Sequence, residues 1–454
     1  MQPPLATPPG VSAVRAREPP PALGGDPGLV RAIGVRQLAA SIVNVTIGAG
    51  IFVLPAAVAA NLGAAAPAAY LVCALAMALI VTSFALAGSR VSLTGGIYAY
   101  VEVAFGPFVG VLAGVLQWLM LWLTAGGLLS AFVDQLGLLV PGAGQGIPRV
   151  AIMLATAALL AFVNLRGVTP GARLVEGVTV AKLLPLALLI GVGVFSLAPG
   201  NLAWPGWPKG DALGGAVLLL IFAFAGIEVA LVPSGEVREP DRSVPRAVYL
   251  ALAVTTLLYL AIQAVAQGVL GSELRAHADA PLAAAAGRLL GAGGRLLVLL
   301  GGAVSMFGYL CGDMLASPRS LFAFGRDRLL PRAFASVHPR FRTPHVAIAT
   351  HAALTAALAA SSTFTHLALL SNVAVLTLYF LGCAAALRFV SRPAAPGAVG
   401  LRLPGERVIP IAAMAVILWI LAHATGRELR VLGATLVVAT LLYVLRRVLT
   451  RPQA

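Results

Sequence analysis

The feature that most constrains this chain is a succession of about twelve apolar runs, each long enough to cross a bilayer as one helix. Short segments between the runs hold most of the charged residues. Of the 454 residues, 59% are hydrophobic and 10% are charged, and the mean hydropathy is +0.95. This composition excludes an ordinary soluble domain. The sequence therefore predicts an all-α polytopic membrane protein whose surroundings are the lipid bilayer.

The predicted spans follow the ends of the apolar runs to within a few residues. They are 38–60, 66–88, 107–133, 148–165, 174–197, 212–233, 247–271, 293–323, 345–361, 364–390, 407–423 and 429–448. The division between the ninth and the tenth is the weakest. Residues 1–31, rich in Pro, Ala and Gly, are expected to form a disordered cytoplasmic tail. A signal peptide is not expected, because the first apolar run lies far from the start of the chain.

The distribution of arginine predicts the orientation in the membrane. Twelve spans place both termini on the same side. If that side is cytoplasmic, the inner segments collect about 23 basic residues and the outer segments about 7, as the positive-inside rule requires. The same pattern accounts for the net charge of +15 without a nucleic-acid partner. Because lysine is scarce relative to arginine, as in GC-rich genomes, we expect a bacterial inner membrane.

The first span is interrupted by Gly48 and Gly50, although a glycine inside a helix costs about 1 kcal/mol relative to alanine. One interpretation is a helix broken at mid-membrane, whose free amides and carbonyls hold a charged ligand. The other is that the glycines only permit close helix packing. The sixth span favours the break, because residues 222–228 (FAFAGIE) interrupt it in a corresponding place.

Matching breaks in the first and sixth spans are typical of an inverted repeat of five plus five helices. Residues 32–200 would form the first repeat, residues 205–392 the second, and residues 400–454 two further spans and a short cytoplasmic C-terminus. At the midplane, half-helix N-termini attract an anion and C-terminal ends attract a cation. Because a zwitterion satisfies both, the predicted substrate is an amino acid or a related amine.

Five ordered motifs resemble those of the amino acid-polyamine-organocation (APC) superfamily of transporters, in a match that extends from about residue 34 to the last span. They are residues 47–52 (IGAGIF), 95–100 (GGIYAY) followed by 105–107 (FGP), 222–228 continuing into 235–247 (GEVREPDRSVPRA), 317–319 (SPR) with 324–331 (FGRDRLLP), and 342–344 (RTP). The resemblance implies the LeuT-like fold, with discontinuous first and sixth helices and alternating access around a central site.

The resemblance also implies which residues bind the substrate. The carboxylate would be held by backbone amides of the first break, from Ala49 to Ile51, and the amino group by carbonyls near Ile47 and in the sixth helix. Phe222 or Phe224 would close over the ligand as an aromatic lid, unless both are ordinary packing residues. The predicted substrate site comprises Ile47, Gly48, Ala49, Gly50, Ile51, Phe222, Phe224, Ala225, Gly226 and Asp313.

Lys182 is the only lysine inside a predicted span. In several APC transporters, a lysine at this place in the fifth helix fills the role that sodium has in related carriers. Loss of the Lys182 proton would remove a positive charge near the first break, so H⁺ is the predicted coupling ion. The alternative is a permanently charged lysine that joins the fifth helix to carbonyls of the first.

Two acidic residues in the spans complete the ionisable set. Glu228 matches a glutamate common in the family, and it is predicted either to bridge helices by hydrogen bonds or to gate by protonation. Asp313 departs from the commonest family pattern. Facing the site, it would accept a cationic side chain or a proton; facing the tenth helix, it would accept a hydroxyl. Ser305, on the same helix, is expected near Lys182. The third-span wall around Gln117 and Thr124 is mostly apolar and favours neutral substrates.

Other functional classes find little support in the sequence. It contains no metal-ligand cluster, nucleophile elbow, phosphate loop or cofactor motif, so an enzyme is not predicted. Two broken helices favour a carrier over a channel. The histidines are expected to be interfacial residues, and they include His338, His345, His351 and His366. The predicted function is a proton-coupled secondary active amino acid transporter of the plasma membrane, with an exchanger or a transporter-like sensor as alternatives. The sequence does not indicate an oligomeric state.

Overall fold

The computed structural model describes residues 34–48, 50–90, 96–166, 171–226, 237, 240–391, 401 and 403–449. Side chains are described over the same ranges except at residues 41, 96, 171–181, 240, 241 and 449. The predicted tail, residues 1–31, lies outside the described residues. Ala49 and Glu228, two of the predicted site residues, also lie outside them.

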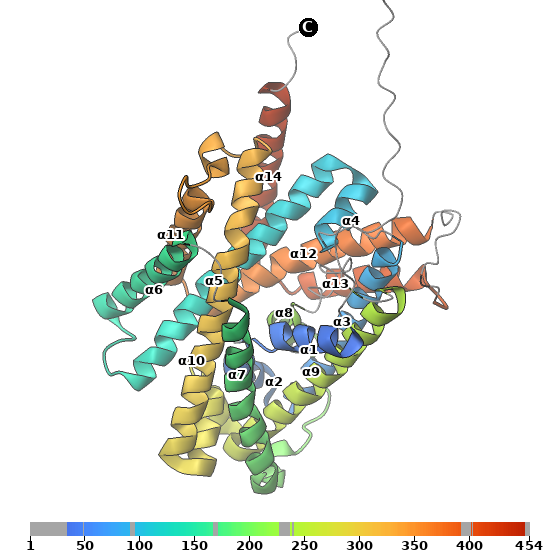
Figure 1. The fold of residues 1–454 in the computed structure, drawn as a ribbon. Helices are drawn as coiled ribbons and strands as arrows, with labels where there is room; N and C mark the ends of the chain where they lie inside the picture. Colours follow the sequence, from blue (N-terminus) through green and yellow to red (C-terminus); the bar gives the residue numbers. More distant parts are fainter. Residues whose placement is uncertain are drawn as a thin grey trace, which may run out of the picture.

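The described chain is built of α-helices joined by loops and short 3₁₀ turns (Figure 1). In chain order the helices are α1 (Val35–Thr46), α2 (Gly50–Leu62), α3 (Ala66–Gly88), α4 (Gly96–Phe105), α5 (Pro107–Leu139), α6 (Gly146–Arg166), α7 (Gly171–Gly193), α8 (Gly210–Phe224), α9 (Pro240–Leu270), α10 (Pro281–Arg326), α11 (His345–Ser361), α12 (Phe364–Val390), α13 (Val408–Leu421) and α14 (Gly426–Leu449). Each helix satisfies its interior backbone groups internally, as a membrane interior requires. The predicted all-α class is confirmed.

The predicted spans correspond to these helices, with α1 and α2 as the two halves of the first span. Seven stretches of the described residues are long and apolar enough to cross a membrane, and one of them, Gly50–Gly88, contains both α2 and α3. Four apolar helices are shorter, including α8 and α11. All twelve predicted spans are therefore represented among the described helices.

Two boundaries are marked by individual residues. The weakly predicted division between the ninth and tenth spans is real, because α11 ends at Ser361 and the side chain of Thr363 caps α12. The eighth span was predicted to begin at residue 293, whereas α10 begins at Pro281. Gly291 explains the difference: its φ of 66° is not helical, so the residues before it form a separate lead-in segment.

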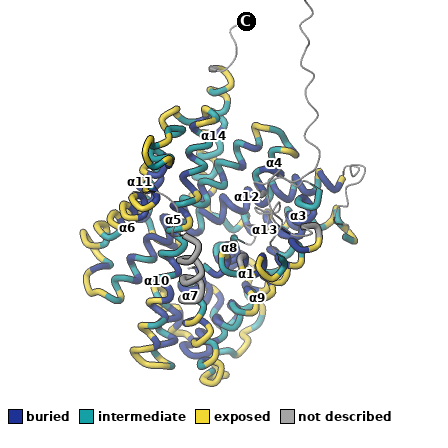
Figure 2. The backbone as a smooth tube through the Cα atoms, in the orientation of Figure 1, coloured by how far each residue is buried: buried dark blue, intermediate teal, exposed yellow. Residues whose placement is uncertain are grey.

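The helices pack in two groups around the broken ones. In one group α3 contacts α2, α8 and α9, and α9 contacts α1 and α2. In the other group α5, α6, α10 and α11 contact one another. Helix α12 joins the groups, because it packs on α3, α5 and α8. Figure 1 places α1, α2 and α8 near the centre of the molecule, and Figure 2 shows buried backbone inside and exposed backbone at its edges.

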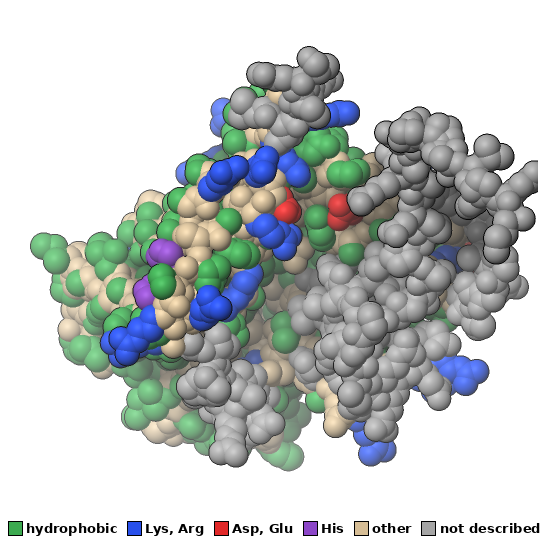
Figure 3. Space-filling model, turned by 45° about the horizontal axis from the view of Figure 1, so that its top comes forward, with side chains coloured by type: hydrophobic (Ala, Val, Ile, Leu, Met, Phe, Trp, Pro, Cys, Tyr) green, Lys and Arg blue, Asp and Glu red, His purple; other side chains and the backbone are tan. Residues whose placement is uncertain are grey.

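The outer faces of the helices are apolar. On α14, Leu441 and Val448 are each 62% exposed. A soluble protein rarely exposes so many large apolar side chains on one helix, whereas a lipid-facing helix does. Charge gathers instead at one end of the molecule, where Figure 3 shows blue Lys and Arg side chains spread over the described part of the face and few red ones. At this end Arg90 forms an ion pair of 2.9 Å with Glu406.

Candidate functional site

The first predicted break is present in the structure. Helix α1 ends at Thr46 and α2 begins at Gly50, and Ile47 between them has a ψ of 71°, which no α-helix contains. The Gly48 amide turns back to the Thr46 carbonyl at 2.7 Å. The first N–H groups of α2 and the last carbonyls of α1 therefore lack partners within their own helices. The two glycines mark an interruption of the helix and do not merely permit close packing.

The second predicted break is also present. Helix α8 ends at Phe224, and Ala225 takes an extended conformation with a ψ of 145°. Gly226 follows with a φ of +107°, in the region that favours glycine. A Cβ atom on Gly226 would lie 3.1 Å from a side-chain carbon of Val45, which belongs to α1. The two breaks, far apart in the sequence, therefore lie against each other.

One hydroxyl joins the two breaks. Tyr259, on α9, places its hydroxyl 2.9 Å from the carbonyl oxygen of Thr46 and 2.8 Å from that of Ala223. These carbonyls stand in the last turns of α1 and α8, where the helix dipoles are negative. A phenol has a single proton to donate, so the two carbonyls share it. The Tyr259 ring is fully buried and packs edge-on against Phe224, with ring centres 5.2 Å apart.

Nothing in the sequence alone singles out Tyr259. A tyrosine in an apolar span looks like an ordinary core residue, and no motif includes it. A buried tyrosine hydroxyl needs a hydrogen-bond partner, and neighbouring helices satisfy their own backbone groups except at breaks. These two facts together indicate that a tyrosine in an apolar span can find its partner at a break.

Lys182 contacts the first helix, as its position predicted. Its ammonium group donates a hydrogen bond of 2.5 Å to the carbonyl oxygen of Asn44, in the last turn of α1, and the residue is only 7% exposed. A cation at the C-terminal end of a helix is stabilised by the helix dipole. The predicted neighbour Ser305 is buried, but its hydroxyl makes no hydrogen bond within the described part of the chain.

The two candidate lid residues differ in their surroundings. A Cβ atom on Gly50 would lie 3.0 Å from Cδ1 of Phe222, so this ring covers the start of α2. The same ring packs edge-on against Phe364 of α12, with ring centres 5.2 Å apart. Phe224 instead packs on Tyr259 and is fully buried. Of the two, Phe222 is the ring placed over the first break.

The described residues of the site are buried or half-buried in this conformation. Ile47 is 1% exposed and Ile51 is 0% exposed. Behind them, Asn372 of α12 donates hydrogen bonds to the carbonyls of Leu218 and Leu219, at 2.7 and 3.2 Å. On the α5 wall, Thr124 bonds the Ser371 hydroxyl of α12 at 2.7 Å. The polar groups of α12 are thus used to hold α5 and α8.

Asp313 lies between α10 and α11. One carboxylate oxygen accepts a hydrogen bond of 2.5 Å from Ser317, and the other lies 2.8 Å from Nε2 of His351. The hydroxyl partner comes from α10 itself, and not from the tenth span as one alternative expected. The interfacial interpretation of His351 was wrong: it is 0% exposed, because its partner on a neighbouring helix draws it into the interior.

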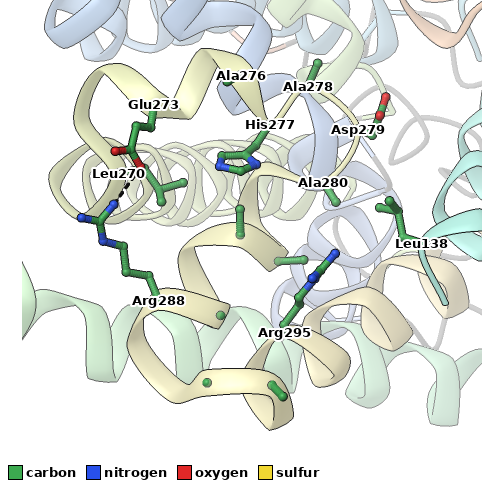
Figure 4. Close-up of a pocket in the computed structure, with 15 residues that line it drawn as sticks. Leu138, Leu270, Glu273, Ala276, His277, Ala278, Asp279, Ala280, Arg288 and Arg295 are labelled. Atoms are coloured by element: carbon green, nitrogen blue, oxygen red, sulfur yellow. Dashed lines mark hydrogen bonds and ion pairs between the residues drawn. The ribbon is translucent and has the colours of Figure 1, made fainter.

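A cavity of about 600 Å³ lies elsewhere. It occupies the end away from the arginine-rich face, where the turn after α9 (Gly271–Ala276) meets the start of α10. Figure 4 shows Glu273 and Arg288 joined at one side of it, with His277 and Arg295 facing the same space. Neither break lines this cavity, so we regard it as a surface vestibule. Among the described residues, His, Cys, Asp and Glu form no cluster that could hold a metal ion.

Comparison with known proteins adds independent information. The family model described as "Amino acid permease" matches residues 33–444. The serine/threonine exchanger SteT of Bacillus subtilis is 30% identical over 72% of this chain and 76% of its own length. The branched-chain amino acid permease BcaP of the same species is 27% identical over 86% of this chain and 87% of its own. An arginine/ornithine antiporter of Pseudomonas aeruginosa is 29% identical over 65% of this chain and 64% of its own.

Proposed function

Because the chain belongs to the amino acid permease family of the APC superfamily, we propose that it is a proton-coupled secondary carrier of neutral amino acids working by alternating access. The family implies the LeuT-like arrangement, and the membrane location follows from the apolar helices. The observation that carries the proposal is the meeting of two broken helices near the centre of the molecule, where Ile47, Gly50 and Ile51 are buried. Backbone groups freed in this way are tolerated in a membrane only where they face protein, a ligand or water.

The charges offered by the breaks match a zwitterion. The N-terminal end of α2, at Gly50 and Ile51, presents amide donors for a carboxylate. The C-terminal ends of α1 and α8 present carbonyls, including those of Thr46 and Ala223, for an ammonium group. Phe222 covers the first break and is the proposed lid. Ala49, Ile227 and Glu228 lie outside the described residues, and Ala49 belongs to the proposal through its place in the motif.

Two observations favour neutral substrates. The α5 wall near Met120 and Thr124 is mostly apolar. Asp313, which otherwise offers a negative charge to a cationic side chain, is already engaged by Ser317 and His351. Relatives whose names specify serine/threonine or branched-chain amino acids support the same class, whereas the arginine/ornithine antiporter supports the cationic alternative. Exchange is the second candidate mode, because two of these relatives are named as an exchanger and an antiporter.

The test is uptake into proteoliposomes of labelled neutral, cationic and acidic amino acids and polyamines, with and without an inward proton gradient. We expect gradient-driven uptake of neutral amino acids. Uptake only when unlabelled amino acid is loaded inside would replace symport with exchange. Binding without flux would indicate a sensor and contradict the proposed carrier.

Lys182 is the proposed coupling residue, since its ammonium lies on the last turn of α1. We expect Lys182→Ala to bind substrate yet lose acceleration by an inward proton gradient, because the positive charge that depends on the proton is gone. The matched control is Lys209→Ala, which removes the only other lysine, an exposed one. Full gradient dependence in Lys182→Ala would assign the residue to helix packing alone.

We further propose that both termini are cytoplasmic and that the membrane is a bacterial inner membrane. The arginine-rich end of the structure, which contains Arg90, Arg326 and Arg446, would then face the cytoplasm. The division into two inverted repeats, residues 32–200 and 205–392, is part of the same proposal.

A further inference from the structure

A buried acid–base cluster lies between α10 and α11 and has no part in the proposed substrate site. The side chains of His351 and Asp313 are 0% and 2% exposed, and their Nε2 and Oδ2 atoms are 2.8 Å apart. Ser317, one turn further along α10, donates a hydrogen bond to the other carboxylate oxygen of Asp313. Ionisable groups inside a membrane protein are costly and are kept where they serve a purpose.

Two protonation states of the Asp313–His351 pair have to be compared. If Asp313 is ionised and His351 is neutral, the pair carries a net negative charge in a dry interior, which is unfavourable. If one proton is added, the pair is neutral, but His351 must then carry a proton on Nδ1. That nitrogen is buried and makes no hydrogen bond to any described residue, so it is unsatisfied in either state, as an acceptor in the first and as a donor in the second. The ionised state carries in addition the cost of a buried negative charge, which one added proton removes.

Other titratable or charged groups stand on the elements that pack on α10 and α11. On the described residues of the elements packed on α10 and α11, they are Asp134 of α5 paired with Arg149 of α6, Arg166 of α6 over Phe162, Lys182 of α7 on Asn44, Arg242, Arg246, Tyr249 and Tyr259 of α9, Glu273 and Arg275 after α9, Arg288, Arg295, Tyr309, Cys311, Arg319 and Arg326 of α10, Arg332 before α11, and His345 at its start. The hydrogen bonds described for Asp313 and His351 are the one between them and the one from Ser317. One added proton balances the charge of the pair without a group from another helix.

From this geometry we propose that Asp313 and His351 form a proton-binding site, separate from Lys182, that takes up one exchangeable proton in addition to the one held between Oδ2 and Nε2. Protonation gives a neutral pair that suits the closed contact of α10 and α11. Loss of the proton to water leaves a negative charge on Asp313 that requires hydration, and so weakens that contact. The nearest end of the membrane is the arginine-rich one, because Arg319 stands six residues, or about 9 Å, further along α10.

The site connects to transport through α10, which packs on both α7 and α2. Helix α7 carries Lys182, and α2 begins at the first break. A change in the packing of α10 on α11 is therefore transmitted to both sides of the proposed substrate site. This effect on transport rests on the proposed function, whereas proton binding by the pair does not.

The first test uses purified protein in nanodiscs without any amino acid. Infrared difference spectra across a pH titration should contain carboxyl and imidazole bands that disappear in Asp313→Asn and His351→Gln. In Ser317→Ala, which keeps the pair but removes one hydrogen bond to Asp313, the same bands should titrate at a different pH. Asp211→Asn, at a fully exposed position, is the control that keeps them. Identical spectra for wild type, Asp313→Asn and His351→Gln would overturn the proposal.

The second test measures uptake against pH. We expect Asp313→Asn, which fixes a neutral side chain, to move the midpoint of the pH profile by about tenfold in proton concentration, and the exposed His366→Gln to leave it unchanged. An unchanged profile in Asp313→Asn would show that the pair does not act on transport. If the wild-type spectra lack the carboxyl and imidazole bands of the pair while uptake is normal, the proton site alone is rejected. If the bands are present but no substrate is taken up, the proposed function alone is rejected. Size-exclusion profiles identify misfolded variants, and Ser317→Ala then provides the deciding spectrum.

Discussion

Single side chains complete the site by reaching backbone carbonyls on other helices. Lys182 reaches α1 from α7, and Tyr259 reaches α1 and α8 from α9. At an interrupted helix the last carbonyls have no amide partner within their own helix, so a donor from a neighbouring helix contributes to what the break removed. The geometry of the breaks therefore depends on side chains that belong to neither of the two broken helices.

Gly50 is a residue at which added bulk should block the proposed substrate site. A Cβ atom there would lie 3.0 Å from the Phe222 ring, and valine would add two further carbons beside the amides proposed to bind carboxylate. We expect Gly50→Val to abolish uptake while leaving expression and folding intact. Gly215→Val is the matched control, because a Cβ atom at that position on α8 meets nothing within 4 Å. Normal transport by Gly50→Val would contradict the assignment of the carboxylate site to the start of α2.

Removal of the Tyr259 hydroxyl should destabilise the protein without creating a cavity in its core. Tyr259→Phe keeps the ring contact with Phe224 but withdraws the donor from Thr46 and Ala223, at a cost of about 1 kcal/mol for a lost hydrogen bond. We expect a lower midpoint of thermal unfolding in detergent for the substrate-free protein. Tyr443→Phe, on the peripheral helix α14, should leave the midpoint unchanged. An equal midpoint for Tyr259→Phe would mean that the hydroxyl holds nothing in place.

The residues differed in how readily the sequence indicated them. Lys182 could be predicted because a charge in an apolar span is rare and needs a partner. Tyr259 could not, since the carbonyls it serves are 213 and 36 positions away. His351 was misjudged for the same reason. Its partner Asp313 is 38 positions away on another helix, and only the packing of α10 on α11 brings them together.

At the scale of helices, the breaks and spans were predictable because they depend on local chemistry. Glycine pairs weaken a helix and apolar length defines a span, and both can be seen in a short window of sequence. The lead-in segment of α10, which ends where Gly291 redirects the chain, was not predicted, because it is too short to count as a membrane span by itself. The close approach of α12 to α3 was also not visible in any window.

The close approach of α12 to α3 leads to a prediction for this pair of helices. A Cβ atom on Gly382 of α12 would lie 2.6 Å from the ring of Phe84 on α3, which is fully buried and packed against Tyr379. We expect Gly382→Ala to destabilise the protein by about 1–3 kcal/mol through overpacking, measured as a lower unfolding midpoint. Gly433→Ala, on an open face of α14, should have no such effect. A stable Gly382→Ala would mean that α12 shifts freely against α3.

For the whole molecule, the orientation can be tested with single cysteines, since Cys73 and Cys383 are buried. Ser272 lies in the turn after α9, and Val337 lies beyond α10 at the arginine-rich end. In intact cells we expect a membrane-impermeant thiol reagent to label Ser272→Cys and to leave Val337→Cys unlabelled until the cells are permeabilised. The unsubstituted protein measures the background from Cys311. The opposite labelling would invert the proposed topology.

The shared hydroxyl of Tyr259 has a consequence for selectivity. Without substrate, the carbonyls at the negative ends of α1 and α8 already accept a hydrogen bond from the Tyr259 hydroxyl. An arriving ammonium group brings three donors where the phenol has one, so it can serve both carbonyls fully and set the phenol free. The net binding free energy is then the difference between the free energies with which the ammonium group and the phenol bind these carbonyls. A molecule without an amino group cannot replace the phenol, so we expect it to bind weakly.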